Sequence, residues 1–394
     1  MRRLGVIVLV CTAVATMAPT GCSSDRPLGF VGNDGGSRGE PLLPDSGAPV
    51  QQGECRTQSD SDVDGDGYTP AGGDCNDCDP NVNPGAFDVL ANGLDEDCSG
   101  KPDDEPVGCD RDIPIDSVDP IDGARALGLC RMASTDAARR WGVVAARYVK
   151  PDLSPEVEPR SHGILPDLGP NFKPFEGARM LSLSSGFARR PDDLTAEEWE
   201  EAEKKYRHAA PPGFPHAPPA CPDKPGGTPY DGAGLELTIR VPTNARSFTF
   251  SHAFFTNEYP DYYCSSYNDV YVVLMSPKVT RDGNIAFDRE GNGVSVNSVL
   301  LDICQPTGGL PVPCKKGPAL LEGTGFDAKS PSAPGTEHGA TSWLTTSSPV
   351  KGGEEITLLF AIWDSADAFL DSTIIADDFR WSVEVTDTPV TRVR

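Results

Sequence analysis

Alternating hydrophobic and polar residues, interrupted by Gly, Pro, Asn and Asp, fill the chain from 230 to 390. This alternation predicts half-buried β-strands, and no helical crossover of about a dozen residues separates one run from the next. The expected strands are LELTIRVP, SFTFSHAFF, DVYVVLMS, ALLEGTGF, SWLTTSSPV, EITLLFAIWDS and DSTIIADDFRWSVEV. We therefore predict a mainly β protein with a C-terminal antiparallel β-sandwich of jelly-roll type.

Residues 111–229 carry mixed patterns and are expected to connect the β-sandwich to the preceding part of the chain. The segment 121–130 (IDGARALGLC) predicts a short helix, and 141–149 (WGVVAARYV) predicts a strand. A longer helix is expected over 194–209, where Thr195 and Glu198 have the spacing of a capping box. The Pro-rich stretch after it favours extended chain.

The first 21 residues have the form of a lipoprotein signal: two arginines, an apolar stretch over 4–18, then small residues before Cys22. This form predicts export, acylation of Cys22 and a lipid anchor at the outer membrane or cell surface. Ser23 stands where some lipoproteins carry an Asp for inner-membrane retention, which favours the outer membrane. Ordinary cleavage nearby, with Cys22 unmodified, is the alternative.

Residues 22–54 are rich in Gly, Pro, Ser and Asp, and predict a disordered tether. The formal charge of the whole chain is −25. Such an acidic protein repels nucleic acid and anionic lipid, so we expect the lipid to be its membrane contact and its partner to be an extracellular ligand or surface component.

Ten cysteines remain apart from Cys11 and Cys22, and they fall into two even groups. In an exported protein such groups predict disulfides within separate parts of the chain. The first group is Cys55, Cys75, Cys78, Cys98, Cys109 and Cys130, and the second is Cys221, Cys264, Cys304 and Cys314. Zinc or redox chemistry at Cys75-x-x-Cys78 would require a second close pair or a helix after a buried strand, and neither is present.

Residues 55–110 form an acidic module with fifteen acidic and two basic residues. Carboxylates at every second position followed by a turn glycine are typical of calcium loops. An EF-hand would need a Glu where Ala71 stands, so the loops are of another type. The candidate Ca²⁺ ligands are Asp60, Asp62, Asp64, Asp66, Asp74, Asn76, Asp77, Asp79, Asp95 and Asp97. A solvated acidic linker is the alternative.

The pattern DxDGDGYTPxxGDCNDxDPxxNPGA…NGxDEDCSG resembles the metal-binding motif of MopE-type extracellular proteins, which is common in myxobacterial lipoproteins. The resemblance covers about 45 residues of the acidic module and implies binding of a divalent metal. One namesake is associated with copper. This module has no His or Met, and sites made only of oxygen suit hard ions such as Ca²⁺.

Three stretches of the β-rich region resemble the choice-of-anchor L family of bacterial extracellular domains: 248–275, 283–299 and 339–379. The resemblance implies a surface domain, whose anchor here would be the lipid at Cys22. Polar residues gather in two of its β-connections and suggest a second metal site. Its candidate ligands are Glu258, Asn268, Asp269, Asp364 and Asp371. Asn and Asp also cap loops through their own backbone, which is the alternative.

Nucleophilic catalysis has little support, because neither HExxH nor GxSxG occurs in the chain. We therefore predict a non-enzymatic, calcium-stabilised surface protein that adheres or binds. The rival hypothesis is a secreted carbohydrate-active hydrolase or a lectin-like domain, in which Glu258 and Asp371 would meet.

Overall fold

The computed structural model describes residues 60–136, 138–199, 201, 205–305, 314–331, 333 and 338–394. The chain divides into two compact units, 1–50 and 51–394, and the described residues all belong to the second. The predicted signal, the tether and Cys22 and Cys55 lie outside the described residues.

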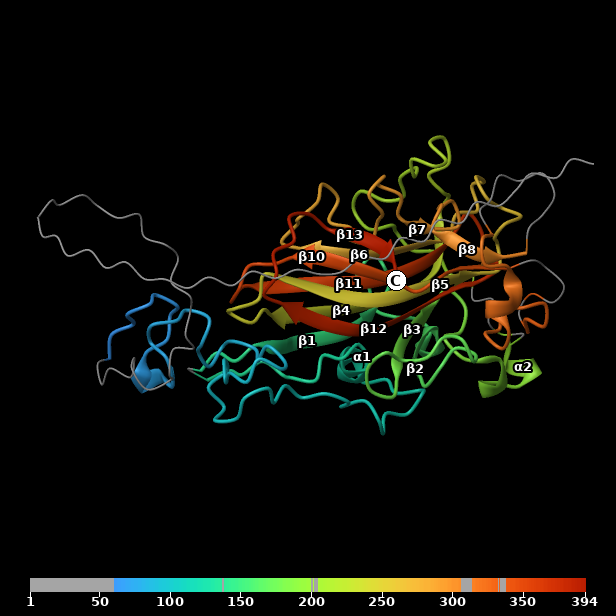
Figure 1. The fold of residues 1–394 in the computed structure, drawn as a ribbon. Helices are drawn as coiled ribbons and strands as arrows, with labels where there is room; N and C mark the ends of the chain where they lie inside the picture. The colour runs from blue at the N-terminus through green and yellow to red at the C-terminus, as the bar shows by residue number, and fades with distance from the viewer. Residues whose placement is uncertain are drawn as a thin grey trace, which may run out of the picture. The chain divides into compact units, whose positions relative to one another are not determined.

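Two antiparallel sheets dominate the second unit (Figure 1). The first has five strands in the order β1-β4-β11-β6-β7. These strands are β1 (Gly142–Val149), β4 (Pro229–Arg240), β11 (Glu355–Ser365), β6 (Val270–Ser276) and β7 (Val294–Ser295). The long strand β11 lies at the centre, where it pairs with β4 on one side and with β6 on the other.

The second sheet has eight strands, six of them in the order β13-β10-β5-β12-β3-β2. They are β13 (Val390–Val393), β10 (Leu344–Pro349), β5 (Ser247–Thr256), β12 (Ser372–Ser382), β3 (Met180–Ser184) and β2 (His162–Leu165). Two short strands, β8 (Leu301–Cys304) and β9 (Gly339–Thr341), pair with each other, and β9 also pairs with β5. The prediction of a mainly β protein with antiparallel sheets is confirmed.

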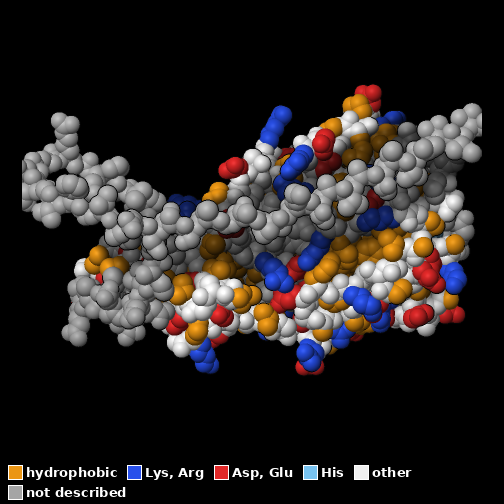
Figure 2. Space-filling model, in the orientation of Figure 1, with side chains coloured by type: hydrophobic (Ala, Val, Ile, Leu, Met, Phe, Trp, Pro, Cys, Tyr) orange, Lys and Arg blue, Asp and Glu red, His pale blue; other side chains and the backbone are white. Residues whose placement is uncertain are grey.

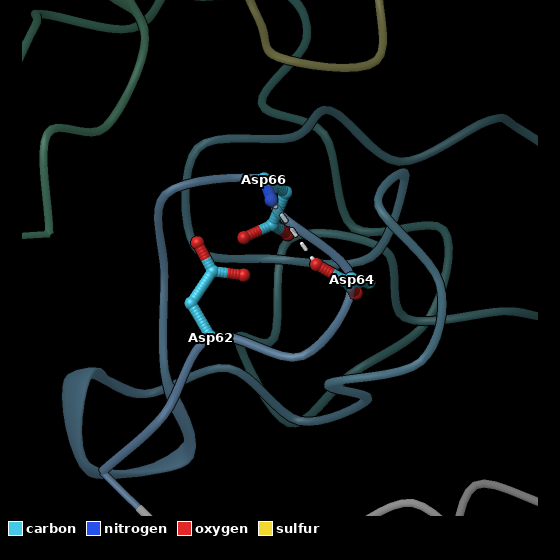
Figure 3. A group of neighbouring side chains, drawn as sticks. All are labelled: Asp62, Asp64 and Asp66. Carbon is cyan, nitrogen blue, oxygen red and sulfur yellow. Dashed lines mark hydrogen bonds between the residues drawn. The ribbon is translucent and has the colours of Figure 1, made fainter.

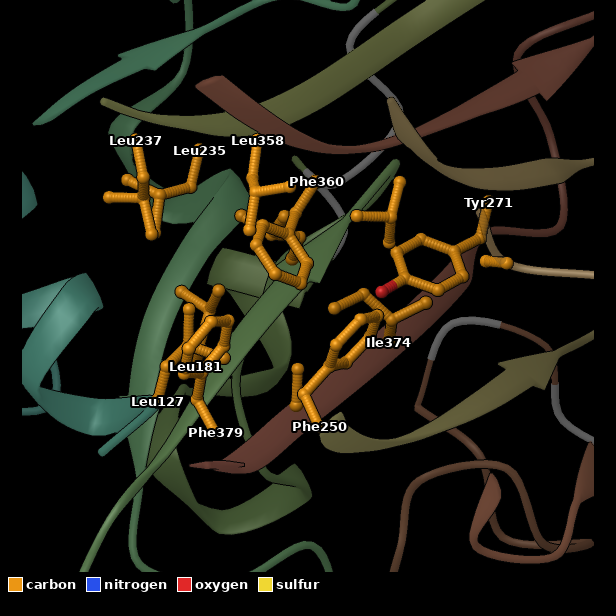
Figure 4. Close-up of a cluster of buried hydrophobic side chains, with 14 of the residues drawn as sticks. Leu127, Leu181, Leu235, Leu237, Phe250, Tyr271, Leu358, Phe360, Ile374 and Phe379 are labelled. Atoms are coloured by element: carbon orange, nitrogen blue, oxygen red, sulfur yellow. The ribbon is translucent and has the colours of Figure 1, made fainter. Parts of the chain in front are cut away.

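The core lies between the two sheets. Figure 4 shows Leu235, Leu358 and Phe360 of the first sheet facing Phe250 and Ile374 of the second. All five side chains are fully buried. Because side chains alternate between the two faces of a strand, the apolar positions of EITLLFAIW and SFTFSHAFF reach this layer from opposite sides. On the outer face visible in Figure 2, basic, acidic and hydrophobic side chains are interspersed.

His252 on β5 is a polar residue inside this core. It is fully buried between Phe250 and Tyr271, and its Nε2 lies 2.7 Å from the hydroxyl of Thr346. Burial lowers the pKa of His252 to about 3. The unfolded chain binds a proton near the ordinary value of 6.5 and the folded chain does not, so stability present above pH 6.5 is lost as the pH falls.

We therefore expect the wild-type protein to lose about 2 kcal/mol of unfolding free energy through His252 between pH 7.5 and pH 5. His252→Leu should remove that part of the pH dependence, and Thr346 would keep its hydrogen bond with Thr391. Urea unfolding at the two pH values measures the difference. His216→Gln, at a half-exposed histidine, is the control. If the unfolding free energy of His252→Leu changed between the two pH values as much as that of the wild type, the result would count against this assignment.

The segment ALLEGTGF (319–326) does not form the predicted strand. The chain makes a 3₁₀ helix, η4 (Pro318–Leu321), followed by turns. Pro318 occupies the first turn of that helix, where proline is favoured because it needs no hydrogen-bonding N–H. Leu321 and Phe326 still face a buried cluster, so their apolar pattern marks burial and not a strand.

The prediction of a long helix over 194–209 is also wrong. The capping box forms as predicted, since Thr195 N donates to Glu198 Oε2 at 2.8 Å and Glu198 N donates to Thr195 Oγ1 at 3.3 Å. However, α2 covers only Ala196–Trp199, and residues 205–209 are not helical. The carboxylate of Asp231 accepts the N–H groups of Lys205 and Tyr206, which draws this segment along the start of β4.

The remaining helices are short. α1 (Pro120–Ala126) overlaps the helix predicted over 121–130 but ends four residues earlier, and Asp119 caps it by accepting the N–H of Ile121. The other 3₁₀ helices are η1 (Pro70–Gly72), η2 (Pro159–Ser161) and η3 (Pro191–Asp193). The region expected to be a connector supplies β1 to the first sheet and β2 and β3 to the second, because its apolar strands complete the sandwich.

Candidate metal centre

The acidic module contains three loops, at 60–68, 74–83 and 92–97. The first acidic loop folds around its own carboxylates. Asp62 accepts the N–H groups of Gly65 at 2.6 Å and Gly67 at 3.0 Å. Asp64 accepts the N–H of Asp66 at 3.2 Å. Gly65 and Gly67 have φ values of 82° and 96°, which favour glycine. The resulting turn directs the three carboxylates toward one another, as Figure 3 shows.

Two groups of carboxylates converge in this loop and the next. The ligand oxygens of Asp62, Asp64 and Asp66 lie within 4.8 Å of one another, and so do those of Asp64, Asp74 and Asp77. Asp64 belongs to both groups. One oxygen of Asp64 and one of Asp74 (Oδ2 in each) are buried without a hydrogen-bond partner. Asp77 ties the loops together by accepting the N–H of Val63 at 2.9 Å.

The electrostatics of these loops favour a cation. Burial raises the pKa of Asp66 to about 6, and repulsion from Asp64 and Asp74 adds to the effect. Burial also raises the pKa of Asp64 and of Asp74, and the charged groups that act most strongly on both are other carboxylates. Carboxylates that are partly desolvated and lack a basic partner are stabilised by a bound cation.

A third carboxylate group is compensated by the protein itself. The ligand oxygens of Asp88, Asp97 and Asp104 also lie within 4.8 Å of one another. Asp88 accepts three backbone N–H groups, from residues 96, 97 and 104, at 2.8–3.1 Å. Arg131 pairs with Asp97 at 2.9 Å. Because these contacts offset part of the charge of the group, we interpret it as a group that holds the loop in place.

The sequence pattern missed Asp88 and Asp104 as members of this group. Asp88 lies outside the alternating runs, and its role depends on backbone N–H groups that only the folded loop presents. Arg131, which follows the module in the chain, was also missed. An isolated basic residue after a cluster of fifteen acidic ones is a weak signal for such a partner.

Four predicted ligands stay outside the three groups. Asp95 accepts the N–H groups of Ser99 and Gly100, both at 2.9 Å. Asp79 binds the backbone and side chain of Asn81. The N–H of Asn76 donates to Asp74, and Asp60 is exposed at the start of the described residues. Loop capping explains Asp79 and Asp95 without a metal.

Disulfides hold the acidic loops in place. Cys75 pairs with Cys98, which joins the second loop to the third, and Cys109 pairs with Cys130. Cys78 is also disulfide-bonded. In the β-rich region, Cys221 pairs with Cys264 and Cys304 with Cys314. Every pair in the described residues joins two cysteines of the same predicted group.

The acidic module is anchored on the β-sandwich. Asn244 accepts the N–H of Phe87 at 3.0 Å and donates to its carbonyl at 2.8 Å. Thr243 donates to Asn83 at 2.8 Å. The ring of Phe87 belongs to the main hydrophobic core. The loops therefore lack a core of their own but share that of the sandwich.

The second predicted set lies at one end of the sandwich, and all five of its residues are buried. Asn268 has a structural role there, because its Oδ1 accepts the N–H of Asn297 at 2.8 Å. No three of the acidic ligand atoms in this set lie within 4.8 Å of one another. Glu258 is only 2% exposed.

None of the helices in the described ranges has the length and hydrophobicity to cross a membrane. No curated protein and no solved structure matches the chain. Two family models do match parts of it. Residues 227–378 match the Choice-of-anchor L domain, and residues 74–104, which hold the second and third acidic loops, match the family described as "Putative metal-binding motif", of MopE type.

Proposed function

We propose that this protein is a lipid-anchored surface protein whose acidic loops bind Ca²⁺ and whose β-sandwich binds an extracellular partner or adheres. The family matches fit a surface-associated, non-enzymatic protein. The described disulfides are typical of export. The signal pattern that ends at Cys22 supports the lipid anchor.

The convergence of two carboxylate groups on Asp64 carries the metal part of the proposal. Each group contains buried or half-buried carboxylates, and one buried oxygen of Asp64 and one of Asp74 have no hydrogen-bond partner. Calcium takes six to eight oxygen ligands, so carboxylates and water can complete its shell. The loops hold no His or Met and their cysteines are in disulfides, which disfavours softer metals such as copper.

Limited proteolysis of the full-length chain tests this proposal. Chymotrypsin can cut the module after Tyr68, Phe87 or Leu94 once the loops open. Extracellular calcium sites bind at about 10⁻⁴–10⁻³ M, so calcium at tenfold excess over Kd should slow cleavage there about tenfold relative to EDTA. The same concentration of MgCl₂ is the control for ionic strength. Identical cleavage rates in calcium and EDTA would contradict the proposal.

The anchor has a separate test. Cys22→Ser should release the protein from the membrane fraction into the soluble fraction, because no acyl chain can then be attached. Fractionation followed by mass spectrometry of the mature N-terminus measures both effects. Ser23→Ala, next to the predicted lipidation site, should leave the protein membrane-bound. A Cys22→Ser protein that stays fully in the membrane fraction would rule out the lipoprotein proposal.

A further inference from the structure

Two connections pass from one sheet to the other at the same end of the sandwich. The first runs from the end of β5 at Thr256 to the start of β6 at Val270, and the second from β11 to β12. Thr256 pairs with Ser372 in one sheet, and Val270 pairs with Trp363 in the other. Four acidic residues lie at these strand ends: Glu258, Asp269, Asp364 and Asp371. We call them the sheet-end carboxylates.

All four sheet-end carboxylates are almost completely buried. Their exposed fractions are 2% for Glu258, 0% for Asp269, 1% for Asp364 and 7% for Asp371. No ion pair between two described residues includes Glu258, Asp269 or Asp364. A buried carboxylate without a counter-charge is costly, because it loses its hydration and gains no compensating attraction.

Some oxygens of these carboxyl groups have hydrogen-bond partners and others do not. Asp269 accepts the N–H of Ser365 at 3.0 Å and the hydroxyl of Ser372 at 2.6 Å. Neither carboxyl oxygen of Asp364 has a hydrogen bond of normal geometry, although the carboxyl group of Asp269 and the hydroxyl of Ser185 both lie beside it. Oε2 of Glu258 also lacks a partner. Buried polar atoms are otherwise nearly always paired, so these oxygens indicate a ligand.

Mutual repulsion adds to the effect of burial. Desolvation raises the pKa of Glu258, Asp269 and Asp364 well above their ordinary values. The nearby charges that raise it further are all carboxylates: Asp364 and Asp367 act on Glu258, and Asp269 and Asp371 act on Asp364. The cluster therefore has to take up either protons or a cation.

We propose that the sheet-end carboxylates bind a divalent cation with the ligand preference of Ca²⁺ at the junction of the two sheets. All donors are oxygen, which suits a hard ion. An ion there would contact Asp364 of one sheet and Glu258, at the end of a strand of the other, and would satisfy the oxygens that the protein leaves unpaired. It would also draw the four carboxylates closer together, with water completing the shell.

The loop after β3 lies against this site. Ser185 donates to the carbonyl of Ser372 at 3.3 Å. The backbone of Gly186 approaches Asp371 so closely that a Cβ atom there would lie 2.0 Å from Oδ2. Only glycine leaves room for the carboxylate at this point. Three connections, two of which carry the ligands, thus enclose the site, and it shares no residue with the acidic loops.

The test measures thermal unfolding of the full chain in an Asp64→Asn background, in EDTA and in calcium at about 5 mM. Calcium should still raise the unfolding midpoint by about 3 °C. Adding Asp364→Asn should abolish that rise, and in EDTA it should leave the midpoint equal or higher, because a buried charge is removed. Glu258→Gln is the second variant should Asp364→Asn fail to fold.

Asp261→Asn is the matched control, because Asp261 lies in the connection from β5 to β6 and is exposed. This variant should keep the full calcium-dependent rise. Two outcomes would overturn the site: no rise in the Asp64→Asn protein, which would mean that the cluster takes up protons only, or an equal rise after Asp364→Asn. Both outcomes leave the calcium proposal for the acidic loops intact, since Asp64 is already replaced.

Discussion

Replacing Asp64 by Asn should weaken calcium binding to the acidic loops at least tenfold, because this carboxylate belongs to both converging groups. The substitution is nearly isosteric, and the amide oxygen can still accept the N–H of Asp66. The loss should therefore come from charge and not from loop geometry. Chymotrypsin cleavage of the module, measured across a calcium series, should need at least tenfold more calcium to reach the same protection.

Asp79→Asn is the matched control for this prediction. Asp79 is also an acidic loop residue, but its carboxylate bonds only to Asn81 and lies outside the three groups. Its replacement should change the calcium concentration that gives half-maximal protection from chymotrypsin by less than twofold. An equal shift in the two variants would mean that overall charge governs protection, and that Asp64 has no specific part in it.

The second large effect is expected at the disulfide between Cys75 and Cys98. It closes a loop with a sequence separation of 23, and removal of such a cross-link costs about 3 kcal/mol through the entropy of the unfolded chain. Apart from disulfides, the loops are held by the shared core and by a few hydrogen bonds to the β-sandwich. A Cys75→Ser, Cys98→Ser double variant should therefore have protease-sensitive loops in EDTA and regain part of its protection in calcium.

Cys304→Ser with Cys314→Ser is the control, because that disulfide lies in the β-rich region. It should leave the calcium dependence of cleavage in the acidic loops unchanged. Should the Cys75 and Cys98 variant resist chymotrypsin in EDTA as well as the wild type does, the loops would derive their order from elsewhere. The hydrogen bonds of Asn244 with Phe87 and of Thr243 with Asn83 would then be sufficient.

Local sequence patterns predicted the strands correctly where the pattern of apolar residues matched the burial of the strand. EITLLFAIWDS and SFTFSHAFF became β11 and β5, whose alternate residues fill the main core on one face while the other face packs in a second hydrophobic cluster. The same reasoning failed at ALLEGTGF, where Pro318 started a 3₁₀ helix. It also failed at 205–209, where a single carboxylate, Asp231, holds the backbone beside β4. Such contacts between distant segments are not encoded in local periodicity.

The candidate metal site was likewise predicted where its contacts are local and missed where they depend on the fold. Alternating Asp and Gly residues identified Asp62, Asp64 and Asp66, because their convergence is local. That Asp74 and Asp77 join Asp64 depends on the fold of the second loop. Arg131, which pairs with Asp97 of the third group, comes from beyond the module. The strand pairings that bring Glu258 near Asp364 likewise exist only in the assembled sandwich.

Calcium binding by the acidic loops is tested most directly by equilibrium dialysis of the chelator-treated full-length protein against ⁴⁵Ca²⁺ at about 1 mM, within the range of extracellular sites. The wild-type and Asp64→Asn proteins are compared at equal protein concentration and in excess MgCl₂. We predict that the wild type retains roughly 0.4 calcium ion more at each site than the variant, which is the difference that a tenfold weaker affinity produces at this concentration. Equal calcium contents for the two proteins would contradict the assignment of the acidic loops as a calcium site.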